Sequence, residues 1–280
     1  MGANVRSNGR GGHTQTMTAR KNNAPYFEFF RKRIDFIRAH CVEADVIEGY
    51  ILWGACVDAL AQIHAACNAS AAKQRNREQF VTFLLSFAPG HHLDRISVPL
   101  LAYDLQQLSK KQGDVFSKAQ ALERHAALAS YAKAAAEKRL WRCDEDKEWT
   151  PKLMSLAMCD ACNRNLWSVV EKNRYANLLY LQYRNCAVHG LYLGMKTSTA
   201  GLPSSPPPWY MNHRVAVDDP SKKTTQGKQT KNPKKHRART RIQFPIWYLV
   251  DLLGELTGEL ERRCAANAWT IPPNPTVKHC

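Results

Sequence analysis

The chain has 280 residues, of which 44% are hydrophobic and 23% charged, and it carries a formal net charge of +16. This length and apolar content suffice for one large domain, or for one domain with appendages, that buries its own core. No run of about eighteen or more apolar residues occurs, and the basic first residues lack the apolar stretch of a secretory signal. We therefore expect neither a membrane span nor export.

The nine cysteines indicate a reducing compartment. Their number is odd and most of them lie within helix-like runs, which is not the pattern of a disulfide framework. Cys159 and Cys162 have the spacing of metal ligands, but no second pair of this kind exists to complete a zinc site, and packing within a helix is preferred. We expect a cytoplasmic protein that needs no metal and no other cofactor.

The positive charge is concentrated in two polar segments. Residues 221–241 contain nine Lys or Arg and residues 1–24 contain four, with no acid in either segment, so that about +3 remains for the rest of the chain. Such segments are typical of nucleic-acid binding, with a solvated linker as the alternative; a basic run does not by itself separate RNA from DNA. The candidate RNA-binding residues are Lys222, Lys223, Lys228, Lys231, Lys234, Lys235, Arg237, Arg239 and Arg241.

Apolar residues recur at helical spacing over most of the first 190 residues. The acidic stretch 144–149 and Pro151 are expected to interrupt the helical run, and Gly190 to end it. Helices are predicted over 26–40, 44–69, 76–88, 98–112, 115–141, 152–188 (one helix or a pair) and, near the end of the chain, 246–269.

Short aromatic and β-branched segments flank the second basic run. Residues 208–217 and 239–245 could form a two-stranded β-ribbon whose tip carries the polycation. Trp209 and Tyr210 could stack on bases or could attach this insertion to the helices. The fold class predicted is all-α, a helical bundle with a basic and conceivably β-stranded insertion before the last helix.

The expected organisation has four parts. A flexible basic arm covers residues 1–24, and a helical bundle covers 25–196. A Pro/Ser-rich and basic insertion covers 197–245. Residues 246–280 supply a helix that packs on the bundle, followed by an irregular tail.

The sequence YRNCAVHG at 183–190 places Arg184, Asn185 and His189 together before a glycine at the end of a predicted helix. Asn185 and His189 are four residues apart and share one helix face. The helix C-terminus favours the charged form of His189 and Arg184 opposes it, which suits a group that takes and gives a proton. With an arginine to bind a phosphate, these residues suit cleavage of RNA by its own 2′-hydroxyl, which leaves a 2′,3′-cyclic phosphate.

This stretch resembles the R-x4-H signature of the HEPN superfamily. The resemblance implies a helical bundle and a metal-independent endoribonuclease of toxin, defence or RNA-processing systems. It also implies a homodimer in which two motifs line one cleft, with Arg184 stabilising the phosphate, Asn185 orienting and His189 acting as general acid and base. A toxin subgroup modified by its antitoxin has a tyrosine two residues after the motif histidine; here Leu191 holds that position, so an antitoxin or regulatory partner stays open.

Two alternatives accompany this interpretation. Arg184 could be an ion-paired structural residue and His189 an ordinary helix-end residue, in which case the chain is an inactive RNA- or DNA-binding or regulatory module. Asp58 could orient Arg184 or could lie on a solvent-facing strip. The sequence contains no phosphate-binding loop, no G-x-S-x-G and no H-E-x-x-H, which argues against P-loop NTPases, α/β-hydrolases and zincins.

Overall fold

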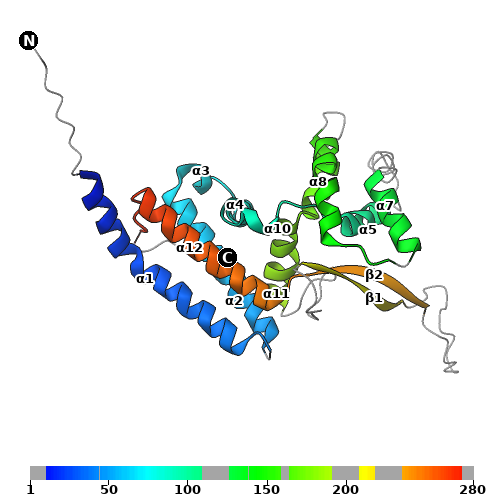
Figure 1. The fold of residues 1–280 in the computed structure, drawn as a ribbon, viewed down its shortest axis with the longest axis horizontal. Helices are drawn as coiled ribbons and strands as arrows, with labels where there is room; N and C mark the ends of the chain where they lie inside the picture. Colours follow the sequence, from blue (N-terminus) through cyan, green and yellow to red (C-terminus); the bar gives the residue numbers. More distant parts are fainter. Residues whose placement is uncertain are drawn as a thin grey trace, which may run out of the picture. The chain divides into compact units, whose positions relative to one another are not determined.

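The computed structural model describes residues 11–43, 45–108, 126–137, 139–158, 164–190, 208–217 and 235–272. The chain divides into two compact units (Figure 1). The bundle unit comprises Met1–Arg95, Arg174–Gly194 and Pro245–Cys280, and the ribbon unit comprises Ile96–Asn173 and Met195–Phe244. Each unit therefore collects segments that are far apart in the sequence.

The bundle unit is helical. Its longer helices are α1 (Gly11–His40), α2 (Val46–Cys67), α4 (Asn76–Phe87) and α12 (Ile246–Ala266). Shorter elements are α3 (Ala69–Ala72), η1 (Pro89–His91), α10 (Tyr175–Leu178), η2 (Leu179–Arg184) and α11 (Asn185–Gly190). The mostly helical character predicted for the chain is confirmed.

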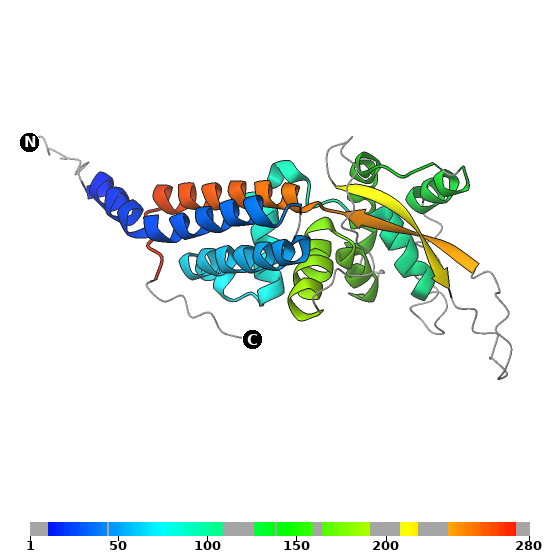
Figure 2. The same cartoon turned by 90° about the horizontal axis from the view of Figure 1, so that it is seen from below.

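The helices α1 and α12 lie side by side in both views (Figures 1 and 2). The buried residues of α1 (Phe27, Phe30, Ile34, Ile37) recur every three or four positions, so that one helix face is apolar. Outside this core, Arg38 donates a hydrogen bond of 3.1 Å to Asp251 of α12, and Arg31 pairs with Glu261. The helix α12 thus packs against α1.

The helix α2 supplies the centre of the bundle unit, with Tyr50, Trp53 and Leu60 fully buried. Gly49 lets its neighbours approach, because a Cβ there would lie 2.8 Å from Cys41 Cβ and 3.0 Å from Ile246 Cγ1. By length and composition α2 could cross a membrane, but the core helix of a soluble protein meets the same test.

Residues 175–190, here called the motif helix, form one continuous helix with a wider turn in its middle. In that π-helical turn the N–H of Asn185 donates to the carbonyl oxygen of Tyr180, five residues earlier. The start of the motif helix is fixed by Tyr175 N–H donating to Arg95 O (2.9 Å) and Ala176 N–H donating to Leu93 O (3.0 Å). The loop after α4 therefore anchors the segment that carries Arg184.

Over its described residues, the ribbon unit combines helices with a two-stranded antiparallel sheet (Figures 1 and 2). Its elements are α5 (Val98–Leu108), α7 (Ala126–Ala136), α8 (Cys143–Met158), α9 (Arg164–Lys172), β1 (Trp209–Val217) and β2 (Lys235–Gln243). Tyr210 pairs with Ile242 in this sheet, and both side chains are buried. The predicted two-stranded ribbon is present.

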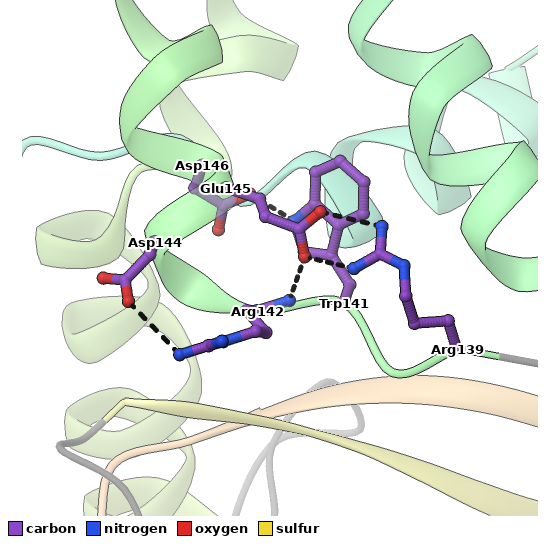
Figure 3. Close-up of polar contacts among 6 residues, drawn as sticks. All are labelled: Arg139, Trp141, Arg142, Asp144, Glu145 and Asp146. Atoms are coloured by element: carbon purple, nitrogen blue, oxygen red, sulfur yellow. Dashed lines mark hydrogen bonds and ion pairs between the residues drawn. The ribbon is translucent and has the colours of Figure 1, made fainter.

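A buried carboxylate, Asp146, links three elements of the ribbon unit. It accepts hydrogen bonds from the backbone N–H of Val98 (3.1 Å), from the indole of Trp141 (2.9 Å) and from the hydroxyl of Tyr210. Figure 3 shows the neighbouring contacts at the start of α8, where Glu145 accepts two hydrogen bonds from Arg139, at 2.7 and 2.8 Å. Burial and the adjacent Asp146 raise the pKa of Tyr210.

Two sequence expectations about this unit are wrong. The acidic stretch begins α8 instead of interrupting the helical run, because carboxylates in a first turn stabilise a helix N-terminus. Pro151 lies inside α8. Proline has no N–H to donate to the preceding turn and its ring crowds that turn, at a cost of about 3 kcal/mol. The helix α8 nevertheless continues through Pro151 and buries Asp146 and Leu153 on either side of it.

The boundaries of the expected parts also differ from those of the units. The helix α1 begins at Gly11, inside the segment expected as a flexible arm. The residues expected as one bundle over 25–196 belong to two units. Cys159 and Cys162 lie outside the described residues, as does the first part, 115–125, of the helix predicted over 115–141.

Candidate functional site

The motif residues lie where the wide turn of the motif helix ends. Arg184 is the last residue of η2, Asn185 is the first of α11, and His189 follows within α11. The side chain of His189 lies outside the described residues. The structure brings Arg184, Asn185 and Asp58 together.

The guanidinium of Arg184 is fixed on two sides. Its Nε and Nη2 lie 2.6 Å and 2.5 Å from Oδ2 of Asp58, and its Nη1 donates to Oδ1 of Asn185 at 2.9 Å. The side chains of Arg184 and Asp58 are 17% and 16% exposed. Asp58 therefore orients Arg184, which was one of the two alternatives that the sequence left open.

One face of α2 is shaped to receive the motif helix. Tyr50, Gly54 and Asp58 are spaced by four residues and so share that face. The ring of Tyr50 lies 5.1 Å from that of Tyr183, and a Cβ on Gly54 would lie 3.0 Å from Cγ and 3.4 Å from Cα of Arg184. A glycine one turn before Asp58 thus allows the close approach that the ion pair needs.

The wide turn places an aromatic ring beside the same arginine. Cζ of Arg184 lies 5.4 Å from the centroid of the Tyr180 ring, within the range of a cation–π contact. The Tyr180 ring in turn contacts Phe80 of α4 at 5.2 Å. Single π-turns within α-helices frequently occur at functional sites.

Opposed effects act on the carboxyl group of Asp58. Burial raises its pKa, while the charge and the hydrogen bonds of Arg184 act in the other direction, and the pKa stays raised overall. Of the five guanidinium N–H groups of Arg184, contacts among the described residues use three. Within the part of the chain that the structure describes, no hydrogen bond uses the other two, and N–H groups of this kind bind anions such as phosphate.

The second group of predicted residues lies on the ribbon. Lys235, Arg237, Arg239 and Arg241 occupy alternate positions of β2, and alternate positions of a strand belong to one face. Their partners in β1 are Val217, Val215, His213 and Met211. Lys222, Lys223, Lys228, Lys231 and Lys234 lie outside the described residues.

Tyr210 attaches the insertion to the helices and does not stack on bases. Its side chain is 2% exposed, its hydroxyl donates to Asp146, and it lies 2.8 Å from Oγ of Ser97. A ring enclosed in this way presents no face to a base. The side chain of Trp209 lies outside the described residues.

The remaining histidines of interest are engaged by the bundle unit. His64 contacts the rings of Phe87 and Trp269, and burial, with the charge of Arg263, lowers its pKa. His91 lies 2.8 Å from Glu255 and 3.0 Å from the Tyr248 hydroxyl. Over the described ranges, no three His, Cys, Asp or Glu side chains are grouped as metal ligands.

Two residues of the candidate site, Gly54 and Tyr180, were not predicted from the sequence. The signal for Gly54 was its position one helical turn before the polar Asp58 on an otherwise apolar helix. Tyr180 lies one turn before Arg184 in a regular helix, but nothing in the sequence marks the wide turn between them.

Comparison with known proteins gives no relative: no family model matches the chain, and neither a curated protein nor a solved structure matches it. The chemistry of these side chains is therefore the basis for the function.

Proposed function

We propose that this protein is a HEPN-like endoribonuclease that cleaves RNA without a metal and leaves 2′,3′-cyclic phosphate ends. The observation that carries the proposal is Arg184, which is held by Asp58 and Asn185 five residues before His189 on one helix. A fixed guanidinium with unused N–H groups suits a phosphate that gains charge in a transition state.

In the proposed reaction His189 removes the proton of a ribose 2′-hydroxyl. The 2′-oxygen forms a bond to phosphorus, and the bond from phosphorus to the 5′-oxygen breaks. Arg184 donates to the non-bridging oxygens as their charge increases. An imidazolium then protonates the leaving 5′-oxygen, and in a homodimer His189 of the second copy can supply it.

In this proposal the ribbon binds RNA and takes no part in its cleavage. The cations of β2, together with those of residues 221–234, would collect RNA through its phosphates without reading its sequence. Binding of that kind weakens steeply as the salt concentration rises. A toxin or defence role in the cytoplasm, with an antitoxin or regulatory partner, belongs to the same proposal.

A specific observation favours a second candidate function. Asp58 neutralises the charge of Arg184, and the ion pair is largely enclosed. An arginine used in this way can be purely structural. The chain would then be an inactive RNA- or DNA-binding or regulatory module.

The experiment that separates the two candidates is incubation of the purified protein with single-stranded RNA in the presence of EDTA. Fragments with 2′,3′-cyclic phosphate ends, absent with Arg184→Ala and His189→Ala, are the expected result. His40→Ala, which replaces an exposed histidine of α1, is the matched control and should cleave normally. Cleavage retained by His189→Ala would contradict the catalytic assignment, and intact RNA that is shifted on a gel would favour the binding module.

A further inference from the structure

A second arginine beside the motif helix is held in the same manner as Arg184. Arg77 of α4 donates from Nε and Nη2 to one oxygen, Oδ1 of Asn177, at 3.0 Å and 2.7 Å. Asn177 belongs to the first turn of the motif helix and is 3% exposed. A buried amide oxygen is therefore used to orient a half-buried guanidinium.

The two arginines differ in the charge of the group that holds them. The carboxylate of Asp58 neutralises Arg184, whereas the amide of Asn177 is neutral and leaves the charge of Arg77 uncompensated. No carboxylate within the described ranges forms an ion pair with Arg77. The adjacent Glu78 turns back and accepts the backbone N–H of Arg75 at 3.1 Å.

The position of Arg77 in its helix strengthens this point. Arg77 lies in the first turn of α4, where the free N–H groups carry partial positive charge and a cation is unfavourable. Helix stability therefore does not explain an arginine here. An anion next to Arg77 would be attracted by its guanidinium and by the start of the helix together.

Arg77 and Arg184 also belong to one connected set of contacts. Asn177 and Arg184 are separated by roughly 10 Å of rise along the motif helix. Between them Tyr180 contacts Arg184 on one side and Phe80 on the other, and Phe80 is one turn after Arg77 on α4. The motif helix thus carries the contacts of both guanidinium groups, about two helical turns apart.

We propose that Arg77 binds a second phosphodiester of the single-stranded RNA whose scissile phosphate lies at Arg184. The inference rests on the proposed function for its ligand. Arg77 would then anchor the strand, while Arg184 acts on the bond that breaks.

The test measures the affinity of a labelled single-stranded RNA for the full-length chain carrying His189→Ala, by fluorescence anisotropy at several salt concentrations. Arg77→Ala should weaken binding roughly tenfold and reduce the slope of log K against log salt by about 0.7. Asn177→Asp keeps an acceptor for Arg77 but neutralises its charge, and it should weaken binding in the same direction. Arg75→Ala removes an equal charge from an exposed neighbour and should have a clearly smaller effect.

Each outcome bears on one of the two claims. Affinity unchanged by both Arg77→Ala and Asn177→Asp, or lowered equally by Arg75→Ala, would overturn the Arg77 subsite even if the wild-type protein cleaves RNA. Binding that depends on Arg77 in a protein that never cleaves would remove the nuclease and leave the subsite. If thermal unfolding shows that Arg77→Ala is not folded, the Asn177→Asp result decides.

Discussion

Each unit contains a buried or nearly buried aspartate, and the two aspartates make different kinds of contact. Asp146 of the ribbon unit is fully enclosed, and a backbone amide, an indole and a phenol hydroxyl donate to it. Asp58 of the bundle unit remains 16% exposed and holds a guanidinium that is itself partly accessible. The first arrangement joins elements of a fold, whereas the second fixes the orientation of a charged group that is 17% exposed.

The largest effect is expected from Asp146→Ala. Three donors would lose a buried acceptor at once, and each unsatisfied buried group costs about 1–3 kcal/mol. We expect the free energy of unfolding to fall by roughly 3 kcal/mol or more, measured by urea denaturation. Asp144→Ala, with a carboxylate that is 78% exposed, should change it by less than about 0.5 kcal/mol.

A smaller effect, of about 2 kcal/mol, is expected from Asp58→Ala, because it leaves Arg184 enclosed without its counter-ion. Asp58→Asn keeps a hydrogen-bond acceptor and should cost less stability. It also removes the charge that neutralises Arg184, so RNA affinity should increase while cleavage falls, because an amide holds the guanidinium less firmly. Equal RNA affinities for wild type and Asp58→Asn would show that Arg184 does not face the ligand.

Gly54→Ala tests the close approach of α2 to the motif helix. The added methyl group would press on Arg184 and outweigh the gain in helix propensity, for a net loss of about 1 kcal/mol and reduced cleavage. Gly258→Ala in α12 is the matched control, since a Cβ there has no atom of the described structure within 4 Å. It should stabilise the protein by up to about 1 kcal/mol.

The smallest expected effect is a pH dependence of stability that Asp58 causes. The pKa of Asp58 in the folded protein is raised above its ordinary value of 3.8. Between the ordinary pKa and the raised pKa, the folded state therefore binds more protons than the unfolded state. The contribution of Asp58 to stability should therefore decrease as the pH rises through this window. Urea denaturation of wild type and Asp58→Asn across the window should show the difference between them changing in that direction; a difference that is constant with pH would contradict the raised pKa.

The sequence was sufficient for features that depend on local pattern. Apolar residues predicted the helices α1, α2 and α12, and β-branched and aromatic residues around a basic run predicted a possible ribbon. The pairing of Asp58 with Arg184 could be anticipated as one of two alternatives, since a polar residue on an apolar helix needs a partner. The chemistry proposed for His189 and the basic residues stays a prediction.

The features that were missed depend on contacts between distant segments. Arg77 and Asn177 are 100 positions apart, and neither residue type has a periodicity that marks the pair. Local propensity predicts only a helix at η2, where Tyr180 contacts Phe80 of α4 and Tyr183 contacts Tyr50 of α2. By propensity Pro151 predicts a helix break, yet α8, which buries Asp146 and Leu153, continues through it.

The chain order of the bundle unit has a consequence for synthesis on the ribosome. The helix α1 emerges before its neighbour α12, and more than two hundred residues separate the two, so their contacts form late. Until α12 emerges, the face of α1 that contains Phe27, Phe30 and Ile34 lacks its final cover. The bundle that carries Arg184 is therefore complete only after α12 has been synthesised.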